Sequence, residues 1–135
     1  LPQDARLHFG AEFNFAGLPS GADDRSFYAP DGNRLGQLGR QLDLNDRTGI
    51  GLADEWLGIG VGLTMSRSSG IWTYPIETVS QSEGGFELVH QSVVVVPHWI
   101  VTPDETGRWS VTMNLSLDTA RAESRRQAPE VAAAS

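Results

Sequence analysis

The sequence contains no cysteine and no lysine among its 135 residues. The absence of cysteine excludes disulfide bonds, thiol nucleophiles and cysteine-ligated zinc sites. All ten basic residues are arginines, so Schiff-base chemistry and the lysine of a phosphate-binding loop are also excluded. The chemistry left to this chain is that of carboxylates, histidines, hydroxyls and aromatic rings.

Long apolar runs and an excess of positive charge are missing as well. No apolar segment approaches the roughly 20 residues that a membrane-spanning helix needs, and the start, LPQDARLHFG, lacks the basic and apolar regions of a signal peptide. Seventeen acids against ten bases give a net charge of −7, which would repel the phosphate backbone of nucleic acid. We therefore expect neither a membrane nor nucleic acid as a partner, and we expect a cytoplasmic location.

Fifteen glycines and seven prolines separate short segments in which apolar and polar residues alternate. This pattern is typical of many strands joined by turns. The length fits one domain, and about eight strands predict an all-β fold, an antiparallel two-sheet β-sandwich of jelly-roll or similar winding. We place the sandwich at residues 1–118 and a flexible or helical tail at residues 119–135, where the strand pattern is lost.

In the first half, residues 7–15 alternate as one half-buried strand, and a brief SFY strand follows between turns. Residues 35–63 fit two or three strands joined at Asn45-Asp46 and near Asp54-Glu55. A helix over residues 35–44 is the competing assignment, but Gly36 and Gly39 would each cost it on the order of 1 kcal/mol.

In the second half, the segment IWTYPIETVSQSEGGFE predicts a strand that ends near Val79, a polar turn through residues 80–85 and the start of the next strand. Pro75 indicates an edge position or a bulge. The run FELVHQSVVVVPHWIV predicts a long strand buried in its middle, and a hairpin loop at residues 103–107 leads to a last alternating strand at residues 108–117.

The groups that could perform catalysis form no recognisable centre. His90 and His98 lie eight residues apart, which is roughly 26 Å along one strand, so with His8 they are best interpreted as single hydrogen-bonded histidines. No GxSxG nucleophile motif is present. Carboxylate pairs such as Asp54 with Glu55, or Glu77 with Glu83 or Glu87, could match the separation used by glycosidases, but so would many surface pairs. We predict no catalytic residue, no metal site and no cofactor.

Aromatic residues close to acids suggest a different chemistry. The apolar face of a sugar stacks on Trp or Tyr while its hydroxyls bond carboxylates. The best candidates for such contacts are Trp72, Tyr74 and Glu77, with Trp56 next. Tryptophans are more often core residues than binding platforms, so a structural role for the same segment is the alternative.

Several segments of the chain resemble a known family. The run ADEWLGIGVGLTMSRSSGIWTYPIETVSQSEGGFELVHQSVVVVPHW, with HFGAEFNFA before it and GRWSVTMNLSL after it, is similar to the C-terminal β-sandwich of α-amylase/4-α-glucanotransferase proteins of glycoside hydrolase family 57. The similarity runs from about Leu7 to Leu117 and covers only the later part of that domain. It is most specific in the DEWL and YPIETVSQSEGGFE blocks.

The resemblance implies a sandwich related to the galactose mutarotase-like supersandwich, in an enzyme whose catalytic residues lie on a separate (β/α) barrel. It implies a non-catalytic accessory domain that supports weak binding of an α-glucan or maltooligosaccharide, or packs against the barrel. Because only the later part of the domain matches, we expect exposed sheet edges that pair in a homodimer or are covered. The alternatives are a purely structural or oligomerising module, and a mutarotase-like enzyme using His90 and Glu87.

Overall fold

The computed structural model describes residues 1–2, 4–16 and 25–124, apart from the side chains of Ser82 and His90. Of the described residues, 65% lie in antiparallel strands and 4% in a helix, which confirms the all-β prediction. The strands are β1 (Leu7–Gly10), β2 (Phe13–Phe15), β3 (Arg25–Tyr28), β4 (Arg34–Gln37), β5 (Leu42–Asp54), β6 (Ile59–Ser82), β7 (Gly85–Val101) and β8 (Met113–Asp118). A single helical turn covers residues 120–124. Within the described residues, no helix is long and apolar enough to cross a membrane.

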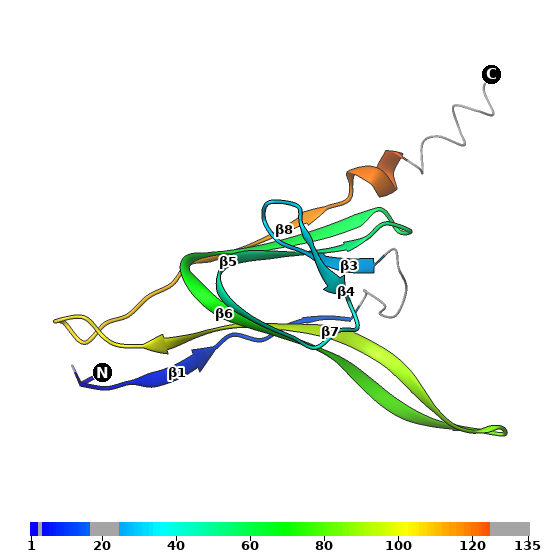
Figure 1. Cartoon of the computed structure of the whole chain (residues 1–135), viewed down its shortest axis with the longest axis horizontal. Helices are drawn as coiled ribbons and strands as arrows, with labels where there is room; N and C mark the ends of the chain where they lie inside the picture. The colour runs from blue at the N-terminus through cyan, green and yellow to red at the C-terminus, as the bar shows by residue number, and fades with distance from the viewer. Residues whose placement is uncertain (3, 17–24, 125–135) are drawn as a thin grey trace.

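The strands form two layers that share two long strands (Figure 1). One layer contains β3, β4, β8, the end of β5 and the start of β6. The other contains β1, β2, β7, the start of β5 and the rest of β6. Hydrogen bonding is continuous in the order β1-β7-β6-β5-β3-β4, so the sandwich is one sheet folded over on itself.

The fold-over occurs where β6 changes partners. Residues 60–65 of β6 pair with β8, and residues 70–82 pair with β7. Strand β5 follows the same bend, because its residues 49–54 pair with the start of β6 and its residues 42–47 with the middle. A register irregularity at residues 45–48 of β5 accommodates the bend, and Asp46 there adopts a positive φ of 53°. Asn45-Asp46 is thus an irregularity inside one strand, where the sequence predicted a joint between two.

The core lies between the two layers. Phe27, Leu52 and Leu63 from one layer face Ile71 and Val95 from the other, and all five side chains are almost fully buried. Burying each such side chain contributes about 1.5–3 kcal/mol relative to leaving it exposed. The alternating segments therefore fold as strands because each has one face to bury here.

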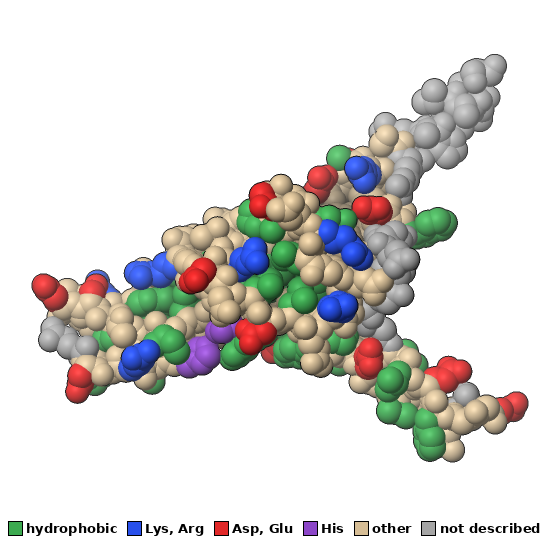
Figure 2. All heavy atoms as spheres, in the orientation of Figure 1, with side chains coloured by type: hydrophobic (Ala, Val, Ile, Leu, Met, Phe, Trp, Pro, Cys, Tyr) green, Lys and Arg blue, Asp and Glu red, His purple; other side chains and the backbone are tan. Residues whose placement is uncertain are grey.

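Beyond this core, β6 and β7 continue as a projecting two-stranded arm, residues 77–91 (Figure 1). Four of its large apolar side chains are exposed: Val79 at 64%, Phe86 at 76%, Leu88 at 70% and, on the opposite face, Val89 at 37%. Val79 pairs with Leu88, and strand alternation puts both on the face that looks toward the core farther down the same strands. Figure 2 shows apolar side chains along this projection.

The strand ends differ from the sequence expectations in three places. Strand β6 runs to Ser82, past the predicted end near Val79, because Glu83 and Gly84 alone form the turn and Gly85, at φ 120°, opens β7. The predicted strand at residues 7–15 is broken at residues 11–12 into β1 and β2, which both pair with β7. The last strand begins at Met113, because residues 108–112 form no ladder although Trp109 packs on the core.

Candidate functional site

A hollow of about 430 Å³ lies on the outer face of the β1-β7-β6 layer. Trp72 and Tyr74 of β6 form part of its wall, with side chains 40% and 37% exposed. The full lining is Gln41, Leu42, Asp43, Trp72, Thr73 and Tyr74. We call this surface, with its two aromatic rings, the platform.

Strand geometry explains why these residues meet. Trp72 and Tyr74 are two positions apart on one strand and therefore point to the same face, while Thr73 between them is buried. Asp43 joins them from β5 because it is the ladder partner of Trp72. The platform is thus a product of alternation within β6 and register between β5 and β6.

A pair of hydrogen bonds fixes the corner that carries Gln41. The hydroxyl of Thr73 donates to the carbonyl oxygen of Arg40 at 2.9 Å and accepts from the N–H of Leu42 at 3.0 Å. These bonds tie the start of β5 to the middle of β6, and each such bond to a buried group contributes about 1 kcal/mol. The amide of Gln41 and the carboxylate of Asp43 are held beside the rings as a result.

Two histidines flank the platform. The ring of His98, from β7, stacks on Trp72 with 3.7 Å between centroids and 25° between planes. Its Nδ1 lies 2.9 Å from Nε2 of His8, on β1. Burial lowers the pKa of His98, and the nearby His8 lowers it further, while Asp43 acts in the opposite direction. Figure 2 shows histidine side chains, in purple, gathered on the visible face.

The platform combines flat apolar rings with hydrogen-bonding groups of several kinds. Such a surface can stack on a ligand with an apolar face and bond to hydroxyls around its rim. Its lining contains one carboxylate, Asp43. Among the described residues, no group of three or more His, Asp or Glu side chains is placed to hold a metal ion.

Of the other residues singled out from the sequence, neither lines the platform. Trp56 is 72% exposed in the turn between β5 and β6. Glu77 stands at the base of the arm, where alternation from Tyr74 puts it on the opposite face of β6. His90, named with Glu87 in the mutarotase-like alternative, has its side chain outside the described residues.

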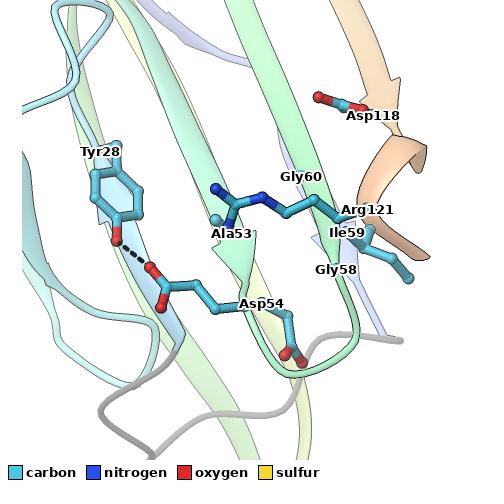
Figure 3. Close-up of a pocket in the computed structure, with 9 residues that line it drawn as sticks. Tyr28, Ala53, Asp54, Gly58, Ile59, Gly60, Asp118 and Arg121 are labelled. Carbon is cyan, nitrogen blue, oxygen red and sulfur yellow. Dashed lines mark hydrogen bonds between the residues drawn. The ribbon is translucent and has the colours of Figure 1, made fainter. Parts of the chain in front are cut away.

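A second hollow, of about 390 Å³, opens beside the β5–β6 turn (Figure 3). Arg121 extends across it from the C-terminal helical turn, and Glu55 accepts a hydrogen bond from the hydroxyl of Tyr28 at 3.3 Å. Asp54 is completely buried, accepts from the N–H of Leu57 at 2.9 Å and pairs with Nε of Arg25 at 3.0 Å. Asp54 therefore closes the turn, and its carboxylate is occupied by structural partners.

Sequence reasoning missed Gln41, Asp43 and the contact between His8 and His98. Strand alternation could have put Asp43 on a surface, but only the pairing of β5 with β6 brings it to Trp72. His8 and His98 are 90 residues apart in the chain and meet diagonally, because His8 pairs with Ile100 and Gly10 with His98. No local signal contains that register.

The sequence and the fold both match known proteins. Residues 1–113 match the family described as "Alpha-amylase/4-alpha-glucanotransferase, C-terminal". A 4-alpha-glucanotransferase of Thermococcus kodakarensis is 31% identical over 90 residues, 67% of this chain and 11% of that protein. An alpha-amylase of Pyrococcus abyssi is 30% identical over 56 residues, 42% of this chain and 7% of that protein.

One solved structure has a similar fold. The crystal structure of a 4-alpha-glucanotransferase from Thermococcus litoralis superimposes with a TM-score of 0.57 over 84% of this chain, at 18% identity. The match covers 14% of that protein. The chain thus spans roughly a tenth of the length of these relatives, and at this identity the superposition speaks for the fold alone.

Proposed function

The chain belongs to the family of C-terminal domains of α-amylases and 4-α-glucanotransferases, and from that premise we propose that it is a non-catalytic accessory domain that holds α-glucan chains at the platform. In this role it serves a catalytic (β/α) barrel in the same protein. The assignment to glycoside hydrolase family 57 is part of the proposal.

The pairing of Trp72 and Tyr74 on one open face carries the proposal. Both rings are partly exposed although they adjoin a buried core, and the cost of leaving two large aromatic surfaces in water suggests a function. Stacking on a pyranose would bury them, while Gln41 and Asp43 bond hydroxyls at the rim. An open hollow buries little of a ligand, so we expect a Kd on the order of 1 mM, about −4 kcal/mol.

The platform's chemistry supports binding without catalysis. Glycoside hydrolysis uses two carboxyl groups roughly 5–10 Å apart across the scissile bond. The platform lining contributes Asp43 alone. Asp54 and Glu55, the adjacent acids in the sequence, lie at the other hollow, where Asp54 is paired with Arg25.

Isothermal titration of maltoheptaose into the whole chain tests the proposal. Trp72→Ala should weaken binding at least tenfold because it removes the ring that stacks on the sugar. Trp56→Ala is the matched control, since Trp56 is more exposed but lies away from the platform. Equal heats for the wild type and the folded Trp72→Ala variant would rule out the platform, and loss of binding in Trp56→Ala alone would move the site to the β5–β6 turn.

The arm favours a second candidate, a module that packs against another protein surface. Val79, Phe86 and Leu88 are exposed on one face of it, and a contiguous apolar face is typical of an interface. The occupant in this version is the catalytic barrel or, in a homodimer, a second copy; the outer edges of β1 and β8 offer further pairing sites.

Sedimentation velocity separates these occupants. A homodimer should dissociate when Phe86 and Leu88 are both changed to Ser, whereas titration of maltoheptaose should be unaffected because both residues lie off the platform. A wild-type chain that sediments as a monomer at about 100 μM, well above the Kd of a typical specific interface, removes the second copy as the occupant.

A further inference from the structure

Three rings from three strands are in contact at the side of the platform. His98 of β7 stacks on Trp72 of β6 and lies 2.9 Å, Nδ1 to Nε2, from His8 of β1. The ring of His8 also lies 5.4 Å from that of Trp72, centroid to centroid. The indole is therefore packed against an imidazole pair that belongs to a different part of the sheet.

His98 has little room to move. Its ring lies directly over Gly70, its ladder partner, where a Cβ would overlap Cε1 and would lie 2.6 Å from Nε2. The absence of a side chain at Gly70 lets the imidazole lie flat enough to stack on Trp72. Any larger residue at position 70 would force the ring away from the indole.

This crowding determines which nitrogen carries the proton. Nε2 of His98 is buried and has no hydrogen-bond partner within the described part of the chain. An N–H at that position would be a buried donor without an acceptor, which costs roughly 1–3 kcal/mol. We therefore assign Nε2 as the unprotonated nitrogen, with Nδ1–H as the donor to Nε2 of His8.

Adding a further proton to this pair is unfavourable at either available nitrogen. A proton added to Nε2 of His8 turns this acceptor into a donor, so that its N–H faces the Nδ1–H of His98. On Nε2 of His98 it creates the buried, unpaired donor against Gly70. The lowered pKa of His98 has the same origin, burial first and His8 second, with Asp43 of β5 opposing. Gly70 and Trp72, which face the ring from β6, carry no charge.

We propose that His98 is a positioning residue for Trp72, held in its stacked place by His8, and that uptake of one proton by the histidine pair releases the indole from the platform. The released indole samples other rotamers. A ligand that stacks on it must then fix one rotamer again, and this entropic cost weakens binding. The consequence for glucan binding rests on the proposed function, while the motion of the indole does not.

The indole N–H signal of Trp72 in a two-dimensional NMR titration from pH 8 to pH 5 tests the release. Trp72→Phe assigns the signal, and Trp109, which contacts Phe9, Trp99 and Arg67, is the internal control. We expect the Trp72 signal to move in one transition shared with the His98 ring protons, while the Trp109 signal stays in place.

Two variants sharpen the result. His8→Gln removes the imidazole that contacts His98 and should shift the transition. Gly70→Ala should give at pH 8 the Trp72 signal that the wild type gives at pH 5. Gly70→Ala tests the stacked geometry without altering either histidine. A Trp72 signal that stays constant while His98 titrates, or that is unchanged in folded Gly70→Ala, would refute the positioning role.

The same samples separate this inference from the proposed function. If the platform binds glucan, affinity for maltoheptaose should fall at least fivefold between pH 8 and pH 5 in the wild type and should be low at both pH values in Gly70→Ala. An indole transition without binding at any pH supports positioning and refutes the glucan site. Binding that is equal at both pH values, without an indole transition, supports the glucan site and refutes the positioning role of His98.

Discussion

The same two strands behave differently at their two ends. In the body, Ile71 of β6 and Val93 and Val95 of β7 are completely buried. In the arm, Val79 and Leu88 occupy the same face of the same hairpin and are mostly exposed. The difference is the second layer, which covers the first region and does not extend over the other. Alternation of apolar residues thus gives a strand an apolar face, but whether that face is buried depends on whether the second layer lies over it.

The two turns of β6 repeat this contrast. The β5–β6 turn is closed by the buried carboxylate of Asp54, and its Gly58, at φ 73°, lies against the backbone of Ala122 so closely that a Cβ there would clash. The β6–β7 turn consists of Glu83 and Gly84, and an added Cβ at Gly84 or at the following Gly85 would meet nothing within 4 Å. One turn is a packed corner and the other is a free tip.

The largest effect should come from truncating a body residue of the hairpin. Ile71→Ala should lower the free energy of unfolding by about 4 kcal/mol, since it leaves a cavity between the layers. Urea unfolding followed by tryptophan fluorescence measures it. Ile71→Val, which removes one methyl group, is the control and should cost about 1 kcal/mol. A loss below that of the control would mean that the layers collapse onto the gap.

The packed corner should come next. Asp54→Ala should destabilise the chain by about 3 kcal/mol, because it leaves the guanidinium of Arg25 without its buried partner and frees the N–H of Leu57. Glu55→Gln, one residue on and exposed, should stay within about 0.5 kcal/mol of the wild type. Similar losses for both variants in urea unfolding would remove the distinction between the two carboxylates.

A smaller effect should follow acidification. The pKa of His98 is lowered from 6.5 in the folded chain, so the unfolded chain binds more protons as the pH falls below 6.5. Stability is therefore fully present above pH 6.5 and is lost progressively between that value and the folded pKa. Urea midpoints between pH 8 and pH 5 measure it. His98→Gln should flatten this part of the profile, and an unchanged slope would assign it to other groups.

The smallest effect should be in the arm. Leu88→Ser should change the free energy of unfolding by no more than about 0.5 kcal/mol, because the side chain is exposed in the free chain. The measurement is again urea unfolding, at a protein concentration of about 1 μM to disfavour association. A loss comparable to that of Ile71→Ala would mean that the arm is covered in solution, by a second copy or by folding back.

Much of the fold could be predicted from local pattern. The segments around Phe27, Ile50, Leu63 and Val95 alternate or form apolar runs that can only be buried in a sheet, and glycine and proline mark the breaks. Which strands pair, and where each strand therefore ends, could not be predicted from local pattern. Strand β6 continues past Val79 because its residues 80–82 pair with residues 85–87 of β7, and the ladder is absent at residues 108–112 although the pattern there is regular.

The site divides in the same way. The sequence by itself determined that Trp72 and Tyr74 share a face of one strand, because alternation is a property of a single extended chain. Only the tertiary structure decided that this face is open, that Asp43 and Gln41 stand beside it, and that His8 and His98 meet on the same face, next to Trp72. Those facts depend on register between strands up to 90 residues apart, and a one-residue shift in that register would turn each of these side chains to the other face.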